Sequence, residues 1–506
     1  MNKTKELIER SYERYLKLVA EINTLHNISA LLSWDQQVWM PGSAHSERGE
    51  QLSQIAQLAH EKFTCSEMED MLGELSDSSA ILQDDASLNV RETQRLFDRE
   101  KRLPAKLVAE LSEAFSNGYD AWLRAKENVN FDHFAPFLNR NVELQREAAE
   151  CYGYTGESYD ALLEGSEPGM TAGRLQILFD GMKETIVPVL LGLRENDYLS
   201  LKKQLNGTYT VNQQKALGSW LLGRVGFNLE AGRIDTAPHP FTTALGTYDV
   251  RLTSWHDEHD PFVGIRATMH EAGHGLYRQG LNPRQRGAPL GSIASRGVDE
   301  AQARFWENCI GKSRSFWEFF FPEFDAAFPL RDKGLDIDSV LRRVNAVIPG
   351  TSRVHADEVT YNLHIILRCE IERDLLRGNL AVKDLPELWD LRMSEEIGVR
   401  PANDAEGVLQ DPHWSDSMFG YFPTYLLGNV YAAQLYSAIR RDLSDFEHFV
   451  RGGDFVPILL WFRDRIYTQG MRYSPEKLIE RATGKEPSHH AFAEYLEQKL
   501  ASIKCS

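Results

Sequence analysis

The chain has 506 residues, of which 42% are hydrophobic and 26% charged, the balance of a folded, water-soluble protein. Its formal net charge of -18 repels phosphate backbones and anionic lipid surfaces, so we expect neither nucleic acid nor membrane as a partner. The first residues are charged and lack the apolar core of a secretory signal, and the five cysteines never form a Cys-x-x-Cys pair, so we expect a reducing cytoplasm.

Helical periodicity dominates the first part of the chain. Over residues 5–28, Ile8, Tyr12, Tyr15 and Ile22 recur at the spacing of one helix face with charged residues between them, which predicts an amphipathic helix. The same pattern predicts helices over residues 50–60, 105–126, 134–152 and 173–194. Short Gly, Pro or Asn breaks separate these segments, so we expect a mostly α-helical fold.

Residues 247–253 depart from the helical rhythm. Apolar and polar side chains alternate there, with Tyr248, Val250 and Leu252 apolar and Asp249, Arg251 and Thr253 polar. This alternation predicts a short strand, and alternate side chains of a strand share one face. We therefore expect a polar strand face that can line a cleft.

A helix is predicted over residues 261–279, and it carries the strongest chemical signal in the sequence. His270 and His274 are four residues apart, so their imidazoles lie about one turn apart on the same side and can bind one metal ion. Glu271 lies beside them, where its carboxylate can accept a proton from a water whose pKa a catalytic zinc lowers to about 7. The spacing predicts a zinc-type hydrolytic centre.

Two glycines, Gly273 and Gly275, lie inside this same helix. Each glycine costs about 1 kcal/mol relative to alanine in a helix interior. We therefore expect another segment of backbone to approach the helix closely at this point.

A catalytic zinc needs a third protein ligand and an open position for water. The segment 298–310 has an apolar stripe of Ala301, Phe305 and Cys309, which leaves its acidic residues on a different face. Glu300 is our predicted third ligand on that face, and Glu307 is the rival.

The last predicted helices run over residues 340–347, 359–376 and 490–503. We find neither an internal repeat nor a low-complexity linker along the chain. These patterns leave the number of units open.

Other interpretations of the histidine pair remain open. A His-Glu-x-x-His segment also occurs by chance in helices, where the histidines are simply solvated or hydrogen-bonded. A non-catalytic peptide-binding protein with a structural metal would close its site with four protein ligands and would leave no bound water. Glu271 is unnecessary for a purely structural ion, which argues against that interpretation.

Further segments accompany the histidine helix in a fixed order. They are Trp34-Asp35, Met40-Pro41, His239-Pro240-Phe241, residues 249–253, residues 270–274, Glu300 within residues 297–304, Arg353 before Ala356-Asp357, residues 407–414 and residues 419–425. With these segments the sequence resembles the thermostable carboxypeptidase (carboxypeptidase Taq) family of metallocarboxypeptidases through most of its length.

The resemblance implies a fold and an activity. The fold is that of a large helical gluzincin-type metallopeptidase with a deep substrate groove and a small β-sheet near the active site. It implies a single unit over residues 1–506, with a helical part of about 1–200 packed on a catalytic part of about 201–506, and a homodimer. The implied activity is release of single C-terminal residues from peptides with a free C-terminus, with broad specificity and zinc or cobalt as the metal. An oligoendopeptidase or dipeptidyl carboxypeptidase of similar fold is the alternative.

The resemblance and the chemistry together suggest catalytic roles. Glu271 would act as general base toward the attacking water and then as acid toward the leaving amine. His413 and Tyr421 are candidates for stabilising the developing oxyanion, as a comparable pair does in related helical gluzincins. Each of these two is also a plausible packed core residue.

Recognition of a terminal carboxylate calls for a guanidinium, which can form a bidentate, charge-assisted pair. Arg353 is our first candidate and Arg251 is its rival, although Asp249 on the same strand face can hold Arg251 in a structural ion pair. Tyr425, within the last matching segment, is a further predicted substrate-binding residue.

One departure from the family pattern concerns the third ligand. Where the family usually has His-Glu-Ser-Gln, this chain has Asp299-Glu300-Ala301-Gln302. Asp299 in place of a histidine adds a negative charge near the ion or the groove. We expect that charge to alter metal affinity, pH optimum or preference for charged termini.

Overall fold

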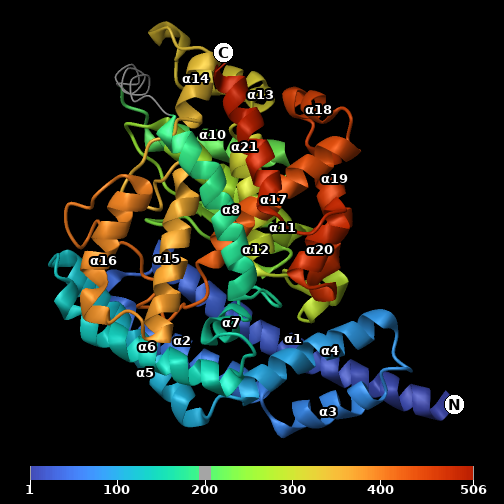
Figure 1. Ribbon diagram of the computed structural model, residues 1–506. Coiled ribbons are helices and arrows are strands. Elements are labelled where there is room, and N and C mark those ends of the chain that lie inside the picture. The colour runs from blue at the N-terminus through green and yellow to red at the C-terminus, as the bar shows by residue number, and fades with distance from the viewer. Residues whose placement is uncertain (1, 193–206, 505–506) are drawn as a thin grey trace.

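The computed structural model describes residues 2–192 and 207–504, and these residues are mostly helical (Figure 1). The N-terminal helices are α1 (Asn2–Val38), α2 (His45–Phe63), α3 (Ser66–Asp77), α4 (Asp84–Lys101), α5 (Ala105–Glu127), α6 (Ala135–Tyr152), α7 (Ser158–Leu163) and α8 (Ala172–Leu191). They are followed by α10 (Val211–Val225), the strands β1 (Gly232–Thr236), β2 (Thr242–Gly246) and β3 (Asp249–Ser254), and α11 (Pro261–Gly280).

The remaining helices cover the C-terminal half of the chain. They are α12 (Arg296–Arg304), which continues into a π-helix (Phe305–Ile310), then α13 (Arg314–Ala327), α14 (Ile337–Val344), α15 (Thr360–Arg377), α16 (Leu385–Arg392), α17 (Pro423–Asp442), α18 (Phe446–Gly452), α19 (Val456–Arg465), α20 (Pro475–Thr483) and α21 (His489–Lys504). A second π-helix spans Met393–Ile397. No helix among these described residues is both long and apolar enough to cross a membrane.

Most of the predicted helices are confirmed, with shifted ends. The helix predicted over 5–28 extends to Val38 because no glycine or proline occurs before Pro41. The helix predicted over 340–347 begins earlier, at Ile337, because the Asp336 side chain accepts the Ser339 N–H and caps that end. The helix predicted over 173–194 ends at Leu191, and its last two predicted positions lie outside the described residues.

The sheet has the strand order β1-β3-β2, with β1 parallel and β2 antiparallel to β3. The predicted strand is confirmed as β3, two residues later at its start. Its expected polar face is only partly formed, because Thr253 is fully buried and its hydroxyl bonds the backbone of Phe241. Asp249 and Arg251 remain partly exposed on that face.

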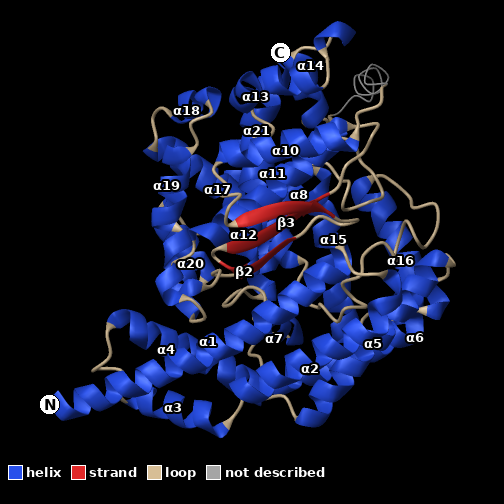
Figure 2. Ribbon diagram, turned by 180° about the vertical axis from the view of Figure 1, so that it is seen from behind, coloured by secondary structure: helices blue, strands red, loops and turns tan. Residues whose placement is uncertain are grey.

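The sheet lies between the N-terminal helices and the helices of the metal centre (Figure 2). β2 contacts α1 on one side, and β3 packs on α11, which in turn packs on α12. α12 packs on α17. The strands therefore border the helix that carries both histidines.

Glycines of α11 and α17 allow these helices to approach α12 closely. A Cβ on Gly273 would overlap the backbone of Gln302 and Ala303 in α12, which confirms the predicted close approach to another backbone segment. A Cβ on Gly275 would instead press on the Phe227 ring. From α17, a Cβ on Gly428 would overlap the side chain of Glu300.

Within the described residues the apolar interior is divided into one large core and two smaller ones. The large core joins buried residues of α5 to α8 with those of α10 to α21. One small core is built from α1, α3 and α4 and contains Ile8, Tyr15, Leu18, Val19, Ile22, Met68, Met71, Leu72, Leu75, Val90 and Phe97. The predicted boundary near residue 200 lies outside the described residues, so the division into two parts stays a prediction.

Candidate metal centre

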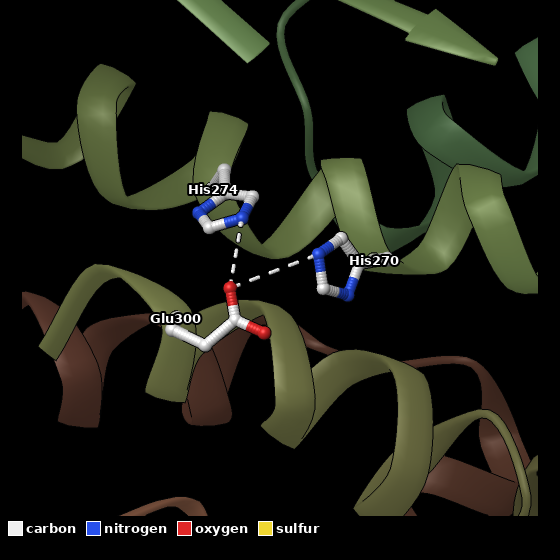
Figure 3. Close-up of side chains that lie close together, drawn as sticks. All are labelled: His270, His274 and Glu300. Atoms are coloured by element: carbon white, nitrogen blue, oxygen red, sulfur yellow. Dashed lines mark ion pairs between the residues drawn. The ribbon is translucent and has the colours of Figure 1, made fainter. Parts of the chain in front are cut away.

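α11 presents the two predicted histidines toward α12. His270 Nε2 lies 3.9 Å and His274 Nε2 lies 3.7 Å from the same oxygen, Glu300 Oε2 (Figure 3). One ligand atom from each residue lies within 4.8 Å of the others, the only such group of three or more His, Cys, Asp or Glu side chains in the described parts of the chain.

This arrangement fits a divalent ion. Two ligand atoms placed tetrahedrally at about 2.0–2.2 Å from one ion are roughly 3.4 Å apart, close to the separations found here. Two imidazole nitrogens and one carboxylate oxygen form a donor set of catalytic zinc sites. His270, His274 and Glu300 are therefore able to hold such an ion.

His270 is fixed from its other nitrogen. Its Nδ1 lies 2.8 Å from Glu307 Oε2, and Arg304 Nη1 donates to the same oxygen at 3.1 Å. Arg304 Nε also donates to Glu300 Oε1 at 2.7 Å, which leaves Oε2 of Glu300 facing the histidines. Glu307, the rival ligand, thus lies on the Nδ1 side of His270, whereas Glu300 faces both Nε2 atoms.

His274 has a matching partner. Its Nδ1 lies 3.2 Å from Asp299 Oδ1, and Arg278 Nη2 donates to Asp299 Oδ2 at 2.6 Å. Burial alone would raise the pKa of the Asp299 carboxyl, but the charges of Arg278 and His274 hold that pKa well below its usual range. The additional negative charge noted in the sequence is therefore paired within the centre.

Glu271 lies next to the histidines and is only 3% exposed. Thr242 Oγ1, at the start of β2, donates to Glu271 Oε2 at 2.6 Å. The hydrogen bond occupies one carboxylate oxygen and orients the other. Nothing in the sequence around Thr242 signals this contact, because it depends on how the sheet packs on α11.

The loop before α17 brings the predicted oxyanion donors together. The rings of His413 and Tyr421 are 5.8 Å apart, and His413 Nε2 lies 3.1 Å from the Tyr425 hydroxyl. Burial lowers the pKa of His413 to about 3, so its imidazole is neutral at neutral pH. Burial raises the pKa of Tyr421, and the negative charges of Glu300 and Asp299 act in the same direction, so its phenol stays protonated.

A buried carboxylate anchors this loop. Glu372 on α15 is fully buried and accepts hydrogen bonds from Tyr159 Oη at 2.7 Å, Trp414 Nε1 at 2.9 Å and the Gly420 N–H at 3.2 Å. Two of these donors belong to the loop that carries His413 and Tyr421. Glu372 therefore ties the loop to α15 and α7.

Arg353 is buried beside the same loop. Its Nε and Nη2 donate to Asp411 Oδ1 at 2.9 and 2.7 Å, and Nη1 donates to the Tyr361 hydroxyl at 3.3 Å. Arg368 Nε donates to the other Asp411 oxygen at 2.7 Å. The Arg353 guanidinium also lies 4.9 Å from the centre of the Tyr425 ring.

Arg251 is engaged elsewhere. Its Nε and Nη2 both donate to Asp249 at 2.9 Å, which is the structural ion pair weighed as an alternative from the sequence. Its guanidinium also lies over the Trp34 ring of α1, 4.5 Å from the centre. Arg251, oriented by Asp249, therefore packs the sheet against α1.

Comparisons with known proteins agree over nearly the whole chain. Residues 14–500 match the family model described as Carboxypeptidase Taq (M32) metallopeptidase. The chain is 40% identical to Thermostable carboxypeptidase 1 of Thermus thermophilus, over 98% of this chain and 99% of that protein. It is 33% identical to Carboxypeptidase 1 of Bacillus subtilis, over 97% and 99%. The crystal structure of the M32 carboxypeptidase from Deinococcus radiodurans superposes with a TM-score of 0.93 and 33% identity, covering 98% of this chain and 100% of that one.

Proposed function

The chain belongs to the carboxypeptidase Taq family of metallopeptidases, and from that premise we propose that it releases single C-terminal residues from peptides with broad tolerance for the side chain. Family membership makes it a metal-dependent carboxypeptidase, and thus a hydrolase that acts on peptides. The observation that carries the finer proposal is the convergence of His270 Nε2, His274 Nε2 and Glu300 Oε2, with Glu271 next to His270 on the same helix.

His270, His274 and Glu300 are the proposed ligands of a zinc ion, with cobalt as an alternative metal. When bound, the ion supplies a Lewis acid that lowers the pKa of a water to about 7 and polarises the scissile carbonyl. Metal analysis of the purified protein tests which ion it retains. Protein that held no divalent ion, and cleaved peptides unchanged in the presence of a chelator, would refute this assignment.

Glu271 is the proposed general base. Thr242 holds Glu271 Oε2, so Oε1 accepts the proton of the attacking water. The same carboxyl then hands that proton to the nitrogen of the leaving amino acid as the peptide bond breaks. Proximity to both histidines and burial on α11 support this role.

Tyr421 and His413 are the proposed oxyanion donors. Both are neutral hydrogen-bond donors at neutral pH, since the Tyr421 phenol keeps its proton and the His413 imidazole is uncharged. A single donor aimed at the developing oxyanion typically contributes about 3 kcal/mol of transition-state stabilisation.

Arg353 is the proposed site for the terminal carboxylate, with Tyr425 packing beside it. An arginine has five N–H donors, and the contacts to Asp411 and Tyr361 use three of them, so two remain for a substrate. Arg251 is a weaker candidate because Asp249 already takes both its Nε and its Nη2. The deep groove leading to Arg353, the homodimer and a cytoplasmic location remain part of the proposal.

A hexapeptide tests the proposal directly. The metal-loaded protein is incubated with the free-acid peptide and with its C-terminal amide, and the products are followed by mass spectrometry. We expect stepwise loss of single residues from the free acid and little cleavage of the amide. Internal cuts, released dipeptides or equal cleavage of both peptides would refute carboxylate recognition and favour an endopeptidase or dipeptidyl carboxypeptidase.

A further inference from the structure

A cavity of about 230 Å³ lies next to the π-helix, outside the proposed active site. Its walls come from the end of the π-helix, residues 312–313, the start of α13, and α14, α17, α18 and α21. Figure 1 shows α13, α14 and α21 together at the end of the molecule that is farthest from α1 to α4. The cavity is large enough to enclose a small ionic ligand together with a few waters.

The lining of the cavity is basic, although the chain as a whole carries a net charge of -18. Its basic residues are Lys312, Arg314, Arg342, Arg440 and Lys499, and its acidic residues are Asp338 and Glu447. Each acidic residue is matched to an arginine of the lining, Asp338 to Arg314 at 2.6 Å and Glu447 to Arg440 at 3.3 Å. The excess of positive charge is thus local.

Lys312 is the most informative of these cations, because it is nearly buried with weak compensation. Its side chain is 11% exposed, and its nearest acidic oxygen is Glu358 Oε2 at 3.5 Å. Both oxygens of Glu358 already accept shorter hydrogen bonds, of 2.6 Å, from Tyr495 and Lys499. A buried ammonium group is costly unless charge and hydrogen bonds compensate it. Lys312 therefore favours an anion in the cavity it lines.

Two further groups are suited to the same ligand. Asn308 is 4% exposed, and its Oδ1 has no hydrogen-bond partner in the part of the chain that the structure describes. Its carboxamide can turn to present the NH2 group as a donor. Ser313, Arg314 and Ser315, at the N-terminus of the 14-residue helix α13, also line the cavity. The first turn of a helix favours negative charge.

Arg342 completes the arrangement from α14. Arg342 lines the cavity, and the hydrogen bond from its Nη2 to Ser339 Oγ is long, at 3.4 Å. Lysine, arginine, a buried amide and a helix N-terminus converging on one cavity form a typical site for a tetrahedral oxyanion. We propose that this cavity is a binding site for a small oxyanion of phosphate size, with Lys312 and Arg342 as its principal cationic contacts.

The proposed anion site adjoins a segment that supports the metal centre. Asn308 follows Glu307, the partner of His270, directly in the π-helix, and Lys312 lies just beyond the end of that helix. The positive charge of Lys312 also contributes to holding the pKa of Glu307 below its usual range. An anion bound here would contact the same segment that supports one of the histidines.

Inorganic phosphate is the probe for this proposal. Metal-loaded protein in phosphate-free buffer is titrated with phosphate by calorimetry, with ionic strength held constant by sodium chloride. We expect saturable binding with a dissociation constant of about a millimolar or below. Variants at the cavity distinguish phosphate bound there from phosphate bound at the metal centre.

Lys312→Gln and Arg342→Gln should each weaken phosphate binding about tenfold or more, the loss expected for one charge-assisted hydrogen bond. Lys383→Gln is the matched control, because Lys383 is exposed and does not line the cavity. This variant should bind phosphate as the wild type does. Absence of saturable binding up to about 50 mM phosphate, or equal weakening by Lys383→Gln, would overturn the site. If circular dichroism shows that Lys312→Gln is unfolded, Arg342→Gln decides alone, and unchanged binding in that variant overturns the site.

Discussion

Each histidine at the centre has a carboxylate at its Nδ1 and an arginine behind that carboxylate. His270 contacts Glu307, which in turn contacts Arg304. His274 lies beside Asp299, which in turn contacts Arg278. When Nδ1–H donates to a carboxylate, the ring is fixed as the tautomer whose Nε2 lone pair faces outward. The hydrogen bond to Glu307 thus turns His270 Nε2 toward the ion, and the Asp299 carboxylate, 3.2 Å from His274 Nδ1, favours the same tautomer there.

Asp299→Asn tests this arrangement at His274. The amide keeps the size of the side chain but removes the charge that pairs with His274 and Arg278, so we expect metal affinity to fall about 10- to 100-fold. Competition with a chromophoric chelator measures the affinity directly, without reference to activity. The exposed Asp332→Asn is the control. Unchanged affinity in Asp299→Asn would mean that Asp299 does not support the ligand.

Glu271→Gln tests the general base. The amide can still accept from Thr242, but it cannot take a proton from water, so we expect kcat to fall by about a thousandfold or more. Metal content, measured by atomic emission, should stay near one ion per chain because Glu271 is not a proposed ligand. Full activity in this variant would exclude Glu271 as the base.

At the residue scale, spacing predicted His270, His274 and Glu271, and the need for a third ligand predicted Glu300. The structure brings His270, His274 and Glu300 together, and Glu271 directly follows His270 on α11. The supporting contacts were not predictable, because Thr242 reaches Glu271 only through the packing of β2 on α11. The pairing of Arg353 with Asp411 was likewise invisible, since it joins segments far apart in sequence.

At the element scale, the contact between α12 and α17 fixes the position of Glu300. Gly428→Ala would place a methyl group against the Glu300 side chain and push it from the histidines. Overpacking of this kind costs about 1–3 kcal/mol, and we expect both weaker metal retention and a lower unfolding midpoint. Gly173→Ala, where a Cβ meets nothing within 4 Å, is the control for an alanine in a helix. Normal metal retention in Gly428→Ala would show that α17 does not set the position of Glu300.

Glu372, which anchors the loop that carries His413 and Tyr421, should make the stability of the protein depend on pH. Burial raises the pKa of Glu372 from 4.5 to about 7. Below about pH 4.5 the group is protonated in both states and its stabilising contribution is fully present. As pH rises toward 7, Glu372 ionises in the unfolded chain but not in the folded protein. The free energy of unfolding therefore declines by about 3 kcal/mol and then levels off.

Glu372→Gln cannot ionise and should remove this part of the decline. Urea unfolding of both proteins at several values between about pH 5 and pH 8 measures the slope, which is the readout irrespective of any constant loss of stability. Parallel curves for the two proteins would show that Glu372 is ionised in the folded state throughout.

The sequence was more informative for helices than for strands. Helices such as α5 and α15 have long periodic patterns, and their predicted ends lie within one residue of those observed. β1 reads Gly-Arg-Ile-Asp-Thr and β2 Thr-Thr-Ala-Leu-Gly, and all their residues are partly or fully exposed, so no alternation marks them. Only β3, with Val250 and Leu252 buried, had a strand pattern that could be recognised.

At the scale of the whole molecule, the small N-terminal core depends on a few polar contacts to the remainder of the chain. Asn89 in α4 is fully buried; its amide donates to Gln285 at 2.8 Å, and its carbonyl oxygen accepts the Leu290 N–H at 3.0 Å. Its amide also donates to Tyr12 of α1 at 3.1 Å. Asn89 therefore links α1 and α4 to the segment that precedes α12.

Asn89→Ala would leave the buried Leu290 N–H without its partner, so we expect a loss of about 1–3 kcal/mol in the free energy of unfolding. Urea unfolding, combined with limited proteolysis of α1 to α4, measures the loss and its location. Asn139→Ala removes only a hydrogen bond at the exposed surface and should change little. Equal effects of the two variants would show that Asn89 does not join the parts.

The third ligand is held by segments made at different times. Glu167 accepts the Gly297 N–H at the start of α12 from 130 positions earlier, whereas Gly428 follows Glu300 by about as many. At about 5–20 residues per second, the ribosome releases α17 roughly 6–25 s after α12. A nascent chain thus carries both histidines and Glu300 well before α17, which positions Glu300, has been synthesised. The position of Glu300 is therefore set only after α17 has been synthesised, in the last part of translation.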